Sequence, residues 1–351
     1  MQTPISGASP SPESWPTPTL VEAAIQVAET PPADTAVMSN QQIAYLSLEG
    51  DLSELYTIRA DGSGLTQLLS ERRLMLDFDA SPDGEQIAFA ACPGSFANDC
   101  LPNADLDIMT IDWDGKSMRN LTASRGDDGH PDWSPDGQIV FDSNRAGDHQ
   151  IYIMNSDGSN QRALTNQAGQ NTEPTWSPDG KWIAYHCMQA SEIRICVVAP
   201  NGQPAGEPIP GTTPVWSPAS PEEGVRLAFL CFQDGHSDVC MAQPDGSELA
   251  NLTNTPADEH TPVWSPDGEW LAFVSNRDNN IDVYKVCVTC PGEPSAVRLT
   301  DEPRAAGWPA WSSDGSRVAY VAGEDLMVVS ADRSDATYLA SGVLSPPIWR
   351  P

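Results

Sequence analysis

A strand-turn-strand unit that recurs along the chain limits what this sequence can fold into. The second strand of the unit begins with an apolar residue, Ala or Val, and an aromatic residue, and it starts at Ile43, Ile87, Ile139, Ile183, Leu227, Leu271 and Val318. The intervals between these starting positions are 44, 52, 44, 44, 44 and 47 residues. A repeat of this length shares its core with its neighbours, so we expect one repeat domain rather than two or three independent domains.

The turn before this strand is Ser-Pro-Asp-Gly in its most regular form, as in residues 174–187 (PTWSPDGKWIAYHC). Pro presets its own φ angle and Gly accepts a positive φ, so the flanking residues are expected to pair as a hairpin. A third and a fourth strand follow in every repeat. Each repeat is therefore predicted to form a four-stranded antiparallel sheet.

The two ends of the repeat array complement each other. Repeats two to seven begin with a first strand, whereas repeat one begins at its second strand, and residues 346–351 (PPIWRP) are a first strand with no second strand after it. We predict an all-β fold, a seven-bladed β-propeller over residues 37–351, in which the C-terminal strand completes blade one and removes an open sheet edge. Residues 1–36, rich in Pro, Ser and Thr, are expected to be a spacer or tail.

The units PDWSPDG, PTWSPDG and PVWSPDG, with the SNR, IY and LT elements after them, resemble the WD40-like (PD40) repeats of TolB-type propellers. They are also similar to the propellers that precede the hydrolase domain of prolyl oligopeptidases and dipeptidyl peptidases. The resemblance covers residues 41–351 and implies the fold, which does not by itself define a function. TolB proteins resemble six blades with an additional N-terminal α/β domain, whereas seven blades and a spacer are expected here. That departure argues against a TolB role in envelope complexes.

The eight cysteines fall into local pairs. The same two strand positions carry cysteine in repeats four and five, which predicts one cross-strand disulfide used twice; the other two pairs bracket an insertion and a turn. The pairs are Cys187 with Cys196, Cys231 with Cys240, Cys92 with Cys100, and Cys287 with Cys290. Four disulfides indicate an oxidising compartment, so we expect a secreted, periplasmic or surface-anchored protein. The alternative for 287–290, a redox or metal-binding CxxC, lacks both a thioredoxin-like βαβ pattern and a second CxxC.

The formal net charge of -31, from 49 acidic and 18 basic residues, argues against nucleic acid and anionic membrane surfaces as partners. It is compatible with cations, proteins or sugars. No apolar run approaches the length of a transmembrane helix.

Several recurring residues are expected to be structural because they are present in most repeats. The repeated tryptophans are expected to pack each blade on the next; they are Trp133, Trp176, Trp216, Trp264, Trp311 and Trp349. The acid that opens the third strand in six repeats is interpreted in the same way. Asn120-Leu-Thr and Asn251-Leu-Thr fit a glycosylation sequon, but they are also the ordinary fourth-strand element.

Function is expected where the repeats differ, in the loops that enter the first strands and meet at one mouth of the central channel. We predict that these loops place carboxylates, two imidazoles and an indole around a binding mouth. The candidate residues are Asp128, His130, Glu173, Asp258, Glu259, His260, Glu302 and Trp308. Sugars bind carboxylates beside an aromatic face, and a divalent cation such as calcium would find oxygen ligands there; no other cofactor is expected. His130 and His260 lie three blades apart, too far to share a metal.

The leading functional hypothesis is a non-catalytic extracytoplasmic propeller that binds a protein, peptide or glycan through its loop face. A Gly-x-Ser-x-Gly elbow is absent and the five histidines are scattered, which argues against peptidase activity. Two alternatives remain open. One is a self-assembling structural subunit joined through residues 1–36, and the other is a lyase-like propeller that cleaves polysaccharides with a His and a metal.

Overall fold

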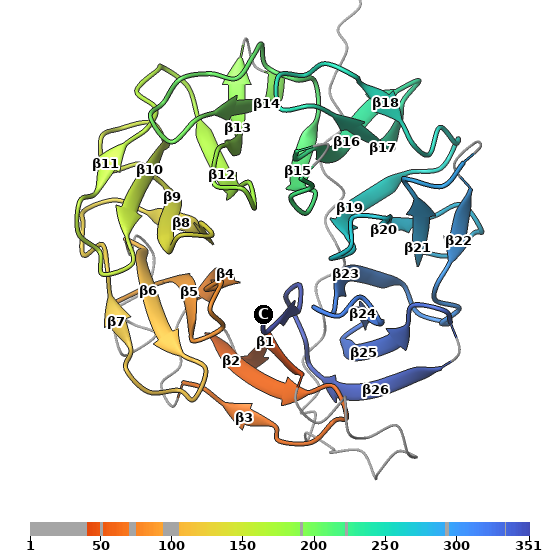
Figure 1. The fold of residues 1–351 in the computed structure, drawn as a ribbon. Helices are drawn as coiled ribbons and strands as arrows, with labels where there is room; N and C mark the ends of the chain where they lie inside the picture. Colours follow the sequence, from red (N-terminus) through yellow and green to blue (C-terminus); the bar gives the residue numbers. More distant parts are fainter. Residues whose placement is uncertain are drawn as a thin grey trace, which may run out of the picture.

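Seven antiparallel sheets surround a central axis in the computed structural model, and this arrangement confirms the predicted all-β, seven-bladed propeller (Figure 1). The structure describes residues 41–49, 52–69, 75–93, 105–189, 192–221, 224–291, 295–333 and 335–351, and this part of the chain contains no helix. The expected tail, residues 1–36, lies outside the described residues.

The strands follow one another blade by blade, from the innermost strand to the outer edge. Blade one contains β1 (Gln42–Glu49), β2 (Leu52–Arg59) and β3 (Thr66–Gln67), and blade two contains β4 (Met75–Ala80), β5 (Gln86–Ala91), β6 (Asp107–Asp112) and β7 (Arg119–Asn120). Blade three contains β8 (Asp128–Trp133), β9 (Gln138–Ser143), β10 (Gln150–Asn155) and β11 (Arg162–Ala163), and blade four contains β12 (Asn171–Trp176), β13 (Ile183–Gln189) and β14 (Glu192–Val198). Blade five contains β15 (Thr212–Trp216), β16 (Leu227–Gln233), β17 (His236–Ala242) and β18 (Ala250–Asn251), and blade six contains β19 (Glu259–Trp264), β20 (Trp270–Ser275), β21 (Asp282–Cys287) and β22 (Ala296–Arg298). Blade seven contains β23 (Ala306–Trp311), β24 (Arg317–Ala322), β25 (Asp325–Ser330) and β26 (Ala336–Ser341), and the chain ends with β27 (Ile348–Trp349).

The ring is closed by β27, which pairs antiparallel with β1 in the sheet of blade one. Ile43 lies opposite Trp349 in this pairing. The Trp349 indole Nε1 donates to the carbonyl of Ala310 in blade seven at 2.9 Å, and Arg350 Nε donates to the carbonyl of Gly84 in blade two at 2.7 Å. The last residues therefore join three blades, as the complementary ends of the array predicted.

Blade four differs from the others at its outer edge. The segment in the fourth position makes two isolated bridges, Ile195 with Ile209 and Val198 with Pro204, instead of a continuous ladder. The three inner strands pair with the same register as in the other blades.

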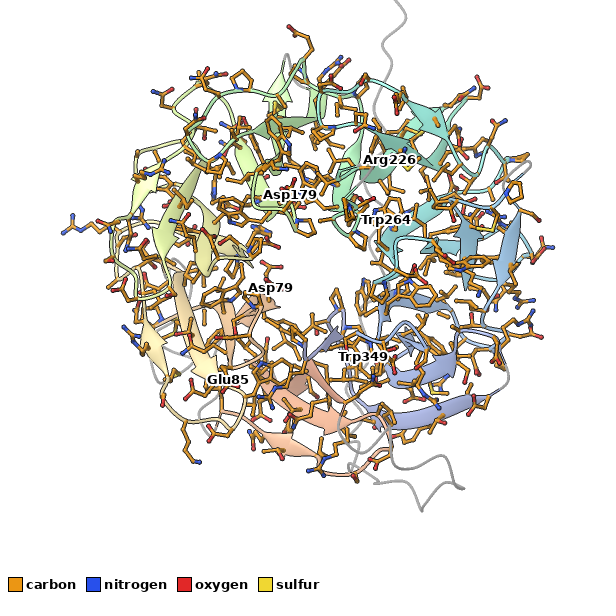
Figure 2. The ribbon with its side chains drawn as sticks, in the orientation of Figure 1. Asp79, Glu85, Asp179, Arg226, Trp264 and Trp349 are labelled. Carbon is orange, nitrogen blue, oxygen red and sulfur yellow. A yellow bond between two sulfur atoms is a disulfide. The ribbon has the colours of Figure 1, made fainter. Side chains whose placement is uncertain are left out.

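The repeated tryptophans pack between blades, as expected. Trp216 Nε1 donates to the Thr175 carbonyl at 3.0 Å, and Trp264 Nε1 donates to the Val215 carbonyl at 3.3 Å, in each case reaching the first strand of the preceding blade. Trp264 and Trp349 lie near the centre of the ring in Figure 2. The indole Nε1 makes this hydrogen bond at Trp216, Trp264 and Trp349. It has no partner at Trp133, Trp176 and Trp311, which pack among apolar side chains of two neighbouring blades.

In blades two and five the acid that opens the third strand binds the fourth-strand element of its own blade. Asp107 accepts hydrogen bonds from Asn120 Nδ2 at 2.7 Å and from Thr122 Oγ1 at 3.3 Å, and Asp238 binds Asn251 and Thr253 in the same way. The Asn-Leu-Thr element is therefore an internal hydrogen-bonding unit, because the Asn side-chain amide donates to a carboxylate of its own blade.

Three of the predicted disulfides are present: Cys187 with Cys196, Cys231 with Cys240, and Cys287 with Cys290. The first two join β13 to β14 and β16 to β17 at equivalent positions. Cys92 is disulfide-bonded, and its expected partner Cys100 lies outside the described residues. No described cysteine is free.

Candidate functional site

A β-bulge in the first strand gives each of several blades one residue that departs from the regular ladder. The register shifts between Gly129 and Asp132 in β8, between Thr172 and Thr175 in β12, and between Thr212 and Val215 in β15. The bulged residue precedes a Pro and has a positive φ of 49° at His130, 53° at Glu173 and 56° at Thr213. Positive φ is uncommon for residues other than Gly and often marks functional positions.

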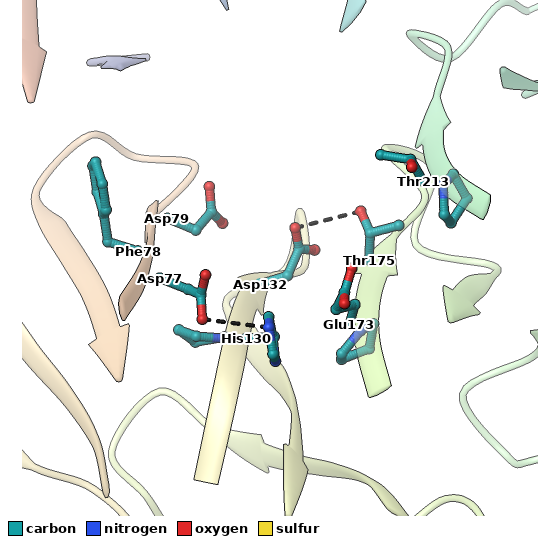
Figure 3. A pocket seen from close by; sticks show the side chains of 11 residues that line it. Asp77, Phe78, Asp79, His130, Asp132, Glu173, Thr175 and Thr213 are labelled. Carbon is teal, nitrogen blue, oxygen red and sulfur yellow. Dashed lines mark hydrogen bonds and ion pairs between the residues drawn. The ribbon is translucent and has the colours of Figure 1, made fainter. Parts of the chain in front are cut away.

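These bulges line a pocket of about 260 Å³ on the inner side of blades two to five (Figure 3). The lining residues are Asp77, Phe78, Asp79, His130, Pro131, Asp132, Glu173, Pro174, Thr175, Thr213 and Pro214. Figure 3 shows carboxylates from three blades and the His130 imidazole gathered within this pocket. The lining thus combines polar groups with Phe and Pro surfaces, as is common in ligand sites.

His130 is held by carboxylates on both ring nitrogens. Its Nδ1 lies 2.7 Å from Asp142 Oδ2, and its Nε2 lies 3.4 Å from Asp77 Oδ2. Asp142 binds a second imidazole, because His149 Nδ1 lies 2.7 Å from its other oxygen.

The pKa values of this group shift in opposite directions. Burial lowers the pKa of His130, but the hydrogen bond and charge of Asp142 and the charges of Asp77 and Glu173 more than offset it and raise the pKa to about 9. Burial raises the pKa of Asp142, but the hydrogen bonds from His130 and His149 lower it to about 2. At neutral pH the pocket therefore contains an imidazolium between carboxylates.

Asp79 and Asp132 are a second pair of carboxyl groups in the pocket, at equivalent positions in blades two and three. Asp79 Oδ2 accepts the backbone N–H of Trp133 at 3.0 Å, and Asp132 Oδ2 accepts that of Trp176 at 2.7 Å. Burial raises the pKa of Asp79 to about 6, and burial together with the charge of Asp79 raises the pKa of Asp132 well above its usual range. This pair holds a proton at pH values where a surface Asp is ionised, so it offers a hydrogen-bond donor as well as acceptors.

Glu173 connects the pocket to blade five. Its Oε2 lies 3.3 Å from His186 Nδ1, and the Thr213 backbone N–H donates to His186 Nε2 at 2.8 Å. The hydrogen bond with His186 lowers the pKa of Glu173, although its burial acts in the opposite direction. Glu173 is therefore an ionised acceptor at neutral pH.

Of the eight residues predicted for the binding mouth, the structure brings His130 and Glu173 together in this pocket. Asp128 and Glu259 are fully buried and pair with Arg145 at 2.9 Å and Arg277 at 2.8 Å, so they brace their own blades instead of facing a channel mouth.

The other four predicted residues lie outside the pocket lining. Asp258 binds Asn276 and holds an interblade loop, and Glu302 accepts from Tyr320 Oη at 3.3 Å. Trp308 occupies the bulge position of blade seven and packs against the core between blades seven and one. His260 is exposed on β19, where the bulged residue is its neighbour Thr261.

Sequence reasoning missed Asp77, Asp79 and Asp132, and it missed the imidazoles of His149 and His186, which contact Asp142 and Glu173. A signal for the first three was available, because they flank the Pro position of the first strand that His130 and Glu173 also flank. The prediction covered the loops before the first strands, whereas these three residues lie within the strands β4 and β8. Among the described residues, no group of three or more His, Cys, Asp or Glu side chains is arranged to hold a metal ion.

Comparisons with known proteins agree with this architecture. The chain is 28% identical over 146 residues to a protein TolB homolog of Chlorobium luteolum, a match that covers 32% of this chain and 34% of that protein. The match therefore spans about a third of the relative's length.

No helix in the described part of the chain is long and apolar enough to cross a membrane.

Solved structures of several proteins share the fold. TolB from Acinetobacter baumannii superposes with a TM-score of 0.54 at 20% identity, over 89% of this chain and 67% of that one. Oligogalacturonate lyase from Vibrio parahaemolyticus superposes with a TM-score of 0.61 at 13% identity, over 87% and 86% of the two chains. A prolyl endopeptidase gives 0.61 at 15% identity, over 87% of this chain and 51% of that chain. At these identities the likeness concerns the fold alone. The TolB β-propeller domain family (PD40) matches residues 38–206 and 208–351, and the chain belongs to this family.

Proposed function

We propose that this protein is a non-catalytic propeller outside the cytoplasm, and that it binds a peptide segment of a partner protein at the pocket on the inner side of blades two to five. The observation that carries the proposal is the pocket itself. Its bulged residues differ from blade to blade, whereas the tryptophans and the third-strand acids repeat for packing. Residues that vary within an otherwise regular repeat are free to serve recognition.

The pocket's chemistry supports a ligand with peptide groups. The Glu173 carboxylate accepts hydrogen bonds, the His130 imidazolium adds positive charge between Asp142 and Asp77, and burial raises the pKa values of the Asp79 and Asp132 carboxyls. Peptide N–H and C=O groups need donors and acceptors in this mixture, and Phe78 with the adjacent prolines offers apolar contacts.

The disulfides support the proposed location. Disulfides persist in oxidising compartments such as the periplasm and the cell exterior.

The test is selection of binders from a random peptide library on the immobilised protein, followed by titration of the selected peptides. His130→Ala and Glu173→Gln are each expected to weaken binding on the order of tenfold, because each removes a charged hydrogen-bonding group. Asp258→Asn, at an interblade loop outside the pocket, is the matched control and should leave affinity unchanged.

If the selected peptides bind both pocket variants as tightly as they bind the wild type, the proposed site is wrong. A parallel glycan array separates the alternative ligand class. If no peptide is selected, and a glycan binds the wild type but not Glu173→Gln, then the ligand of the pocket is a sugar and not a peptide.

A further inference from the structure

The Cys287–Cys290 disulfide occupies a turn that the other blades form without cysteine. Cys287 is the last residue of β21, opposite Trp270, and Cys290 follows it after the strand has ended. Asn155 in blade three and Ser330 in blade seven hold the place of Cys287, because each lies opposite the residue that precedes the repeated apolar strand start. The other blades therefore serve as an internal comparison for this disulfide.

In the other six blades a backbone hydrogen bond joins the two positions that carry cysteine in blade six. The N–H at the second position donates to the carbonyl at the first at 2.8 or 2.9 Å; the pairs are Gly62 with Arg59, Gly115 with Asp112, Gly158 with Asn155, Gly202 with Ala199, Gly246 with Gln243, and Arg333 with Ser330. In blade six the N–H of Cys290 donates to the Sγ of Cys287 at 3.0 Å. Since six blades turn without a covalent bond at this place, reduction of the disulfide is compatible with the fold.

The cross-strand disulfides have a different place in the repeat. Cys187 and Cys196 in blade four stand where blade three carries Ser143 and Tyr152. Arg145 Nε donates to Ser143 Oγ at 2.8 Å, and the Arg145 guanidinium lies 4.8 Å from the centre of the Tyr152 ring. The disulfides of blades four and five therefore replace a contact that holds two strands of a sheet together.

Access to sulfur also separates the two kinds of disulfide. Cys290 is exposed, as are the residues before and after it, and its partner Cys287 is 9% exposed. Each cross-strand disulfide pairs one buried cysteine, Cys187 or Cys240, with a partly buried one. A thiolate must reach a sulfur before it can exchange with a disulfide, so Cys290 is the most open point of attack in these three disulfides.

We propose that Cys287–Cys290 is a thiol–disulfide exchange site, which accepts two electrons from an external dithiol while the propeller stays folded. One thiolate of the dithiol forms a bond to Cys290 Sγ, and the electron pair of the broken S–S bond leaves on Cys287 Sγ. The N–H of Cys290 already points at that sulfur and can donate to the thiolate that forms there.

The second thiolate of the dithiol then attacks the dithiol's own sulfur in the mixed disulfide. This step closes the disulfide of the reagent and releases Cys290 as a thiolate. In sum the protein gains two thiols, and the dithiol loses two electrons and the two protons that those thiols take up. The reverse sequence, with an oxidised dithiol, restores the bond. This site is separate from the pocket and does not depend on a peptide ligand.

The test exposes the native protein to dithiothreitol without oxygen, quenches samples with acid, and alkylates the free thiols in denaturant. Peptide mass spectrometry then gives the fraction of each cysteine that was reduced. We expect Cys287 and Cys290 to be reduced at least about tenfold faster than the cross-strand pairs, with an unchanged circular dichroism spectrum. Oxidised dithiothreitol should restore the disulfide. Equal rates at the three disulfides, or loss of the folded spectrum together with the Cys287–Cys290 bond, would overturn the proposal.

Two double variants are the matched controls. Cys287→Ser with Cys290→Ser should oxidise no dithiothreitol during the fast phase, whereas Cys187→Ser with Cys196→Ser should oxidise as much as the wild type. A fast phase that persists in the first variant would assign the reaction to another disulfide and overturn the site. Glu173→Gln should leave the rate unchanged, because the pocket takes no part in the exchange.

Reduced thioredoxin serves as a protein dithiol and separates the two sources of the reagent. Reduction by thioredoxin and by dithiothreitol would show that the site admits a protein dithiol, and reduction by dithiothreitol alone would assign it to a small dithiol. A thioredoxin that lacks its second active-site cysteine stops at the mixed disulfide, which should lie on Cys290. A mixed disulfide on Cys287 would overturn the assignment of the attacked sulfur, and a wild type that neither reagent reduces would overturn the site.

Discussion

Asp142 binds two imidazoles at once, and this makes it the residue on which the charge of the pocket wall depends. One oxygen faces His130 and the other faces His149, and the Glu173 backbone N–H also donates to Asp142 at 3.1 Å. Its side chain is 1% exposed, so the carboxylate is stabilised by these donors instead of by water. Without that charge, His130 would return toward an ordinary pKa and the pocket would lose its imidazolium.

Asp142→Asn should therefore destabilise the protein in a pH-dependent way. The pKa of His130 is raised from 6.5 to about 9, so its stabilisation by Asp142 is complete below about pH 6.5 and is lost as the pH rises through 9. Since the His130 side chain is 39% exposed, we expect a loss of about 1–2 kcal/mol at pH 6 that shrinks above pH 9.

Urea denaturation at the two pH values measures this difference. Asp258→Asn removes a carboxylate that is itself 43% exposed and lies 3.7 Å from His236, so it should cost little at either pH. A loss for Asp142→Asn of the same size at both pH values would mean that packing, and not the imidazolium, accounts for it.

At the scale of the element, the hairpin of the second and third strands is stabilised in two different ways. The same position is braced by Arg, Ser and Tyr in blades three and six, and by a disulfide in blades four and five. Each brace joins two strands near the end where the hairpin turns, so each limits opening of the sheet edge.

Cys187→Ser with Cys196→Ser should lower the free energy of unfolding by about 2–3 kcal/mol, the entropy of closing a loop between residues nine apart. Cys287→Ser with Cys290→Ser is the matched control and should cost less, because those residues are three apart. Denaturant titration of the two double variants compares them. Equal losses would show that loop closure does not account for the stabilisation.

The repeat made the elements predictable, and the bulges made the site hard to predict. Periodicity of the Ile-Ala-Tyr type, the Ser-Pro-Asp-Gly turn and the cysteine spacing are local signals, and they set strand order, closure and disulfide pairing. The site depends on one-residue offsets: the bulge selects Thr261 and not its neighbour His260, while Asp128 and Glu259 turn into the blades. The Arg of Ser-Asn-Arg in these same two blades was the available sign that both acids had an internal partner.

At the scale of the whole molecule, stability depends on closure of the ring at blade one. Blades two to seven each take their strands from one continuous segment, whereas blade one joins β27 to β1. Trp349 is 8% exposed and packs in the core between blades seven and one. Loss of that contact would leave the edge of β1 open to solvent.

Trp349→Ala should cost about 3–5 kcal/mol, as is typical when a large buried aromatic side chain is removed. Trp216→Ala, at the equivalent position within the ring, is the matched control and should cost a similar amount. Hydrogen exchange separates the two, because only Trp349→Ala should expose the amides of β1. Protection of β1 equal to that in Trp216→Ala would mean that the ring stays closed without the indole.

Blade one also dictates the order in which the molecule can be assembled. Its innermost strand is synthesised after all the other blades, so a nascent chain that emerges from a ribosome or a translocon holds an open arc until the last segment arrives. During that interval the unpaired β1 can recruit a strand from another chain. Producing cells would then benefit from a chaperone that shields this edge, and recombinant yields would depend on how quickly the final segment is delivered.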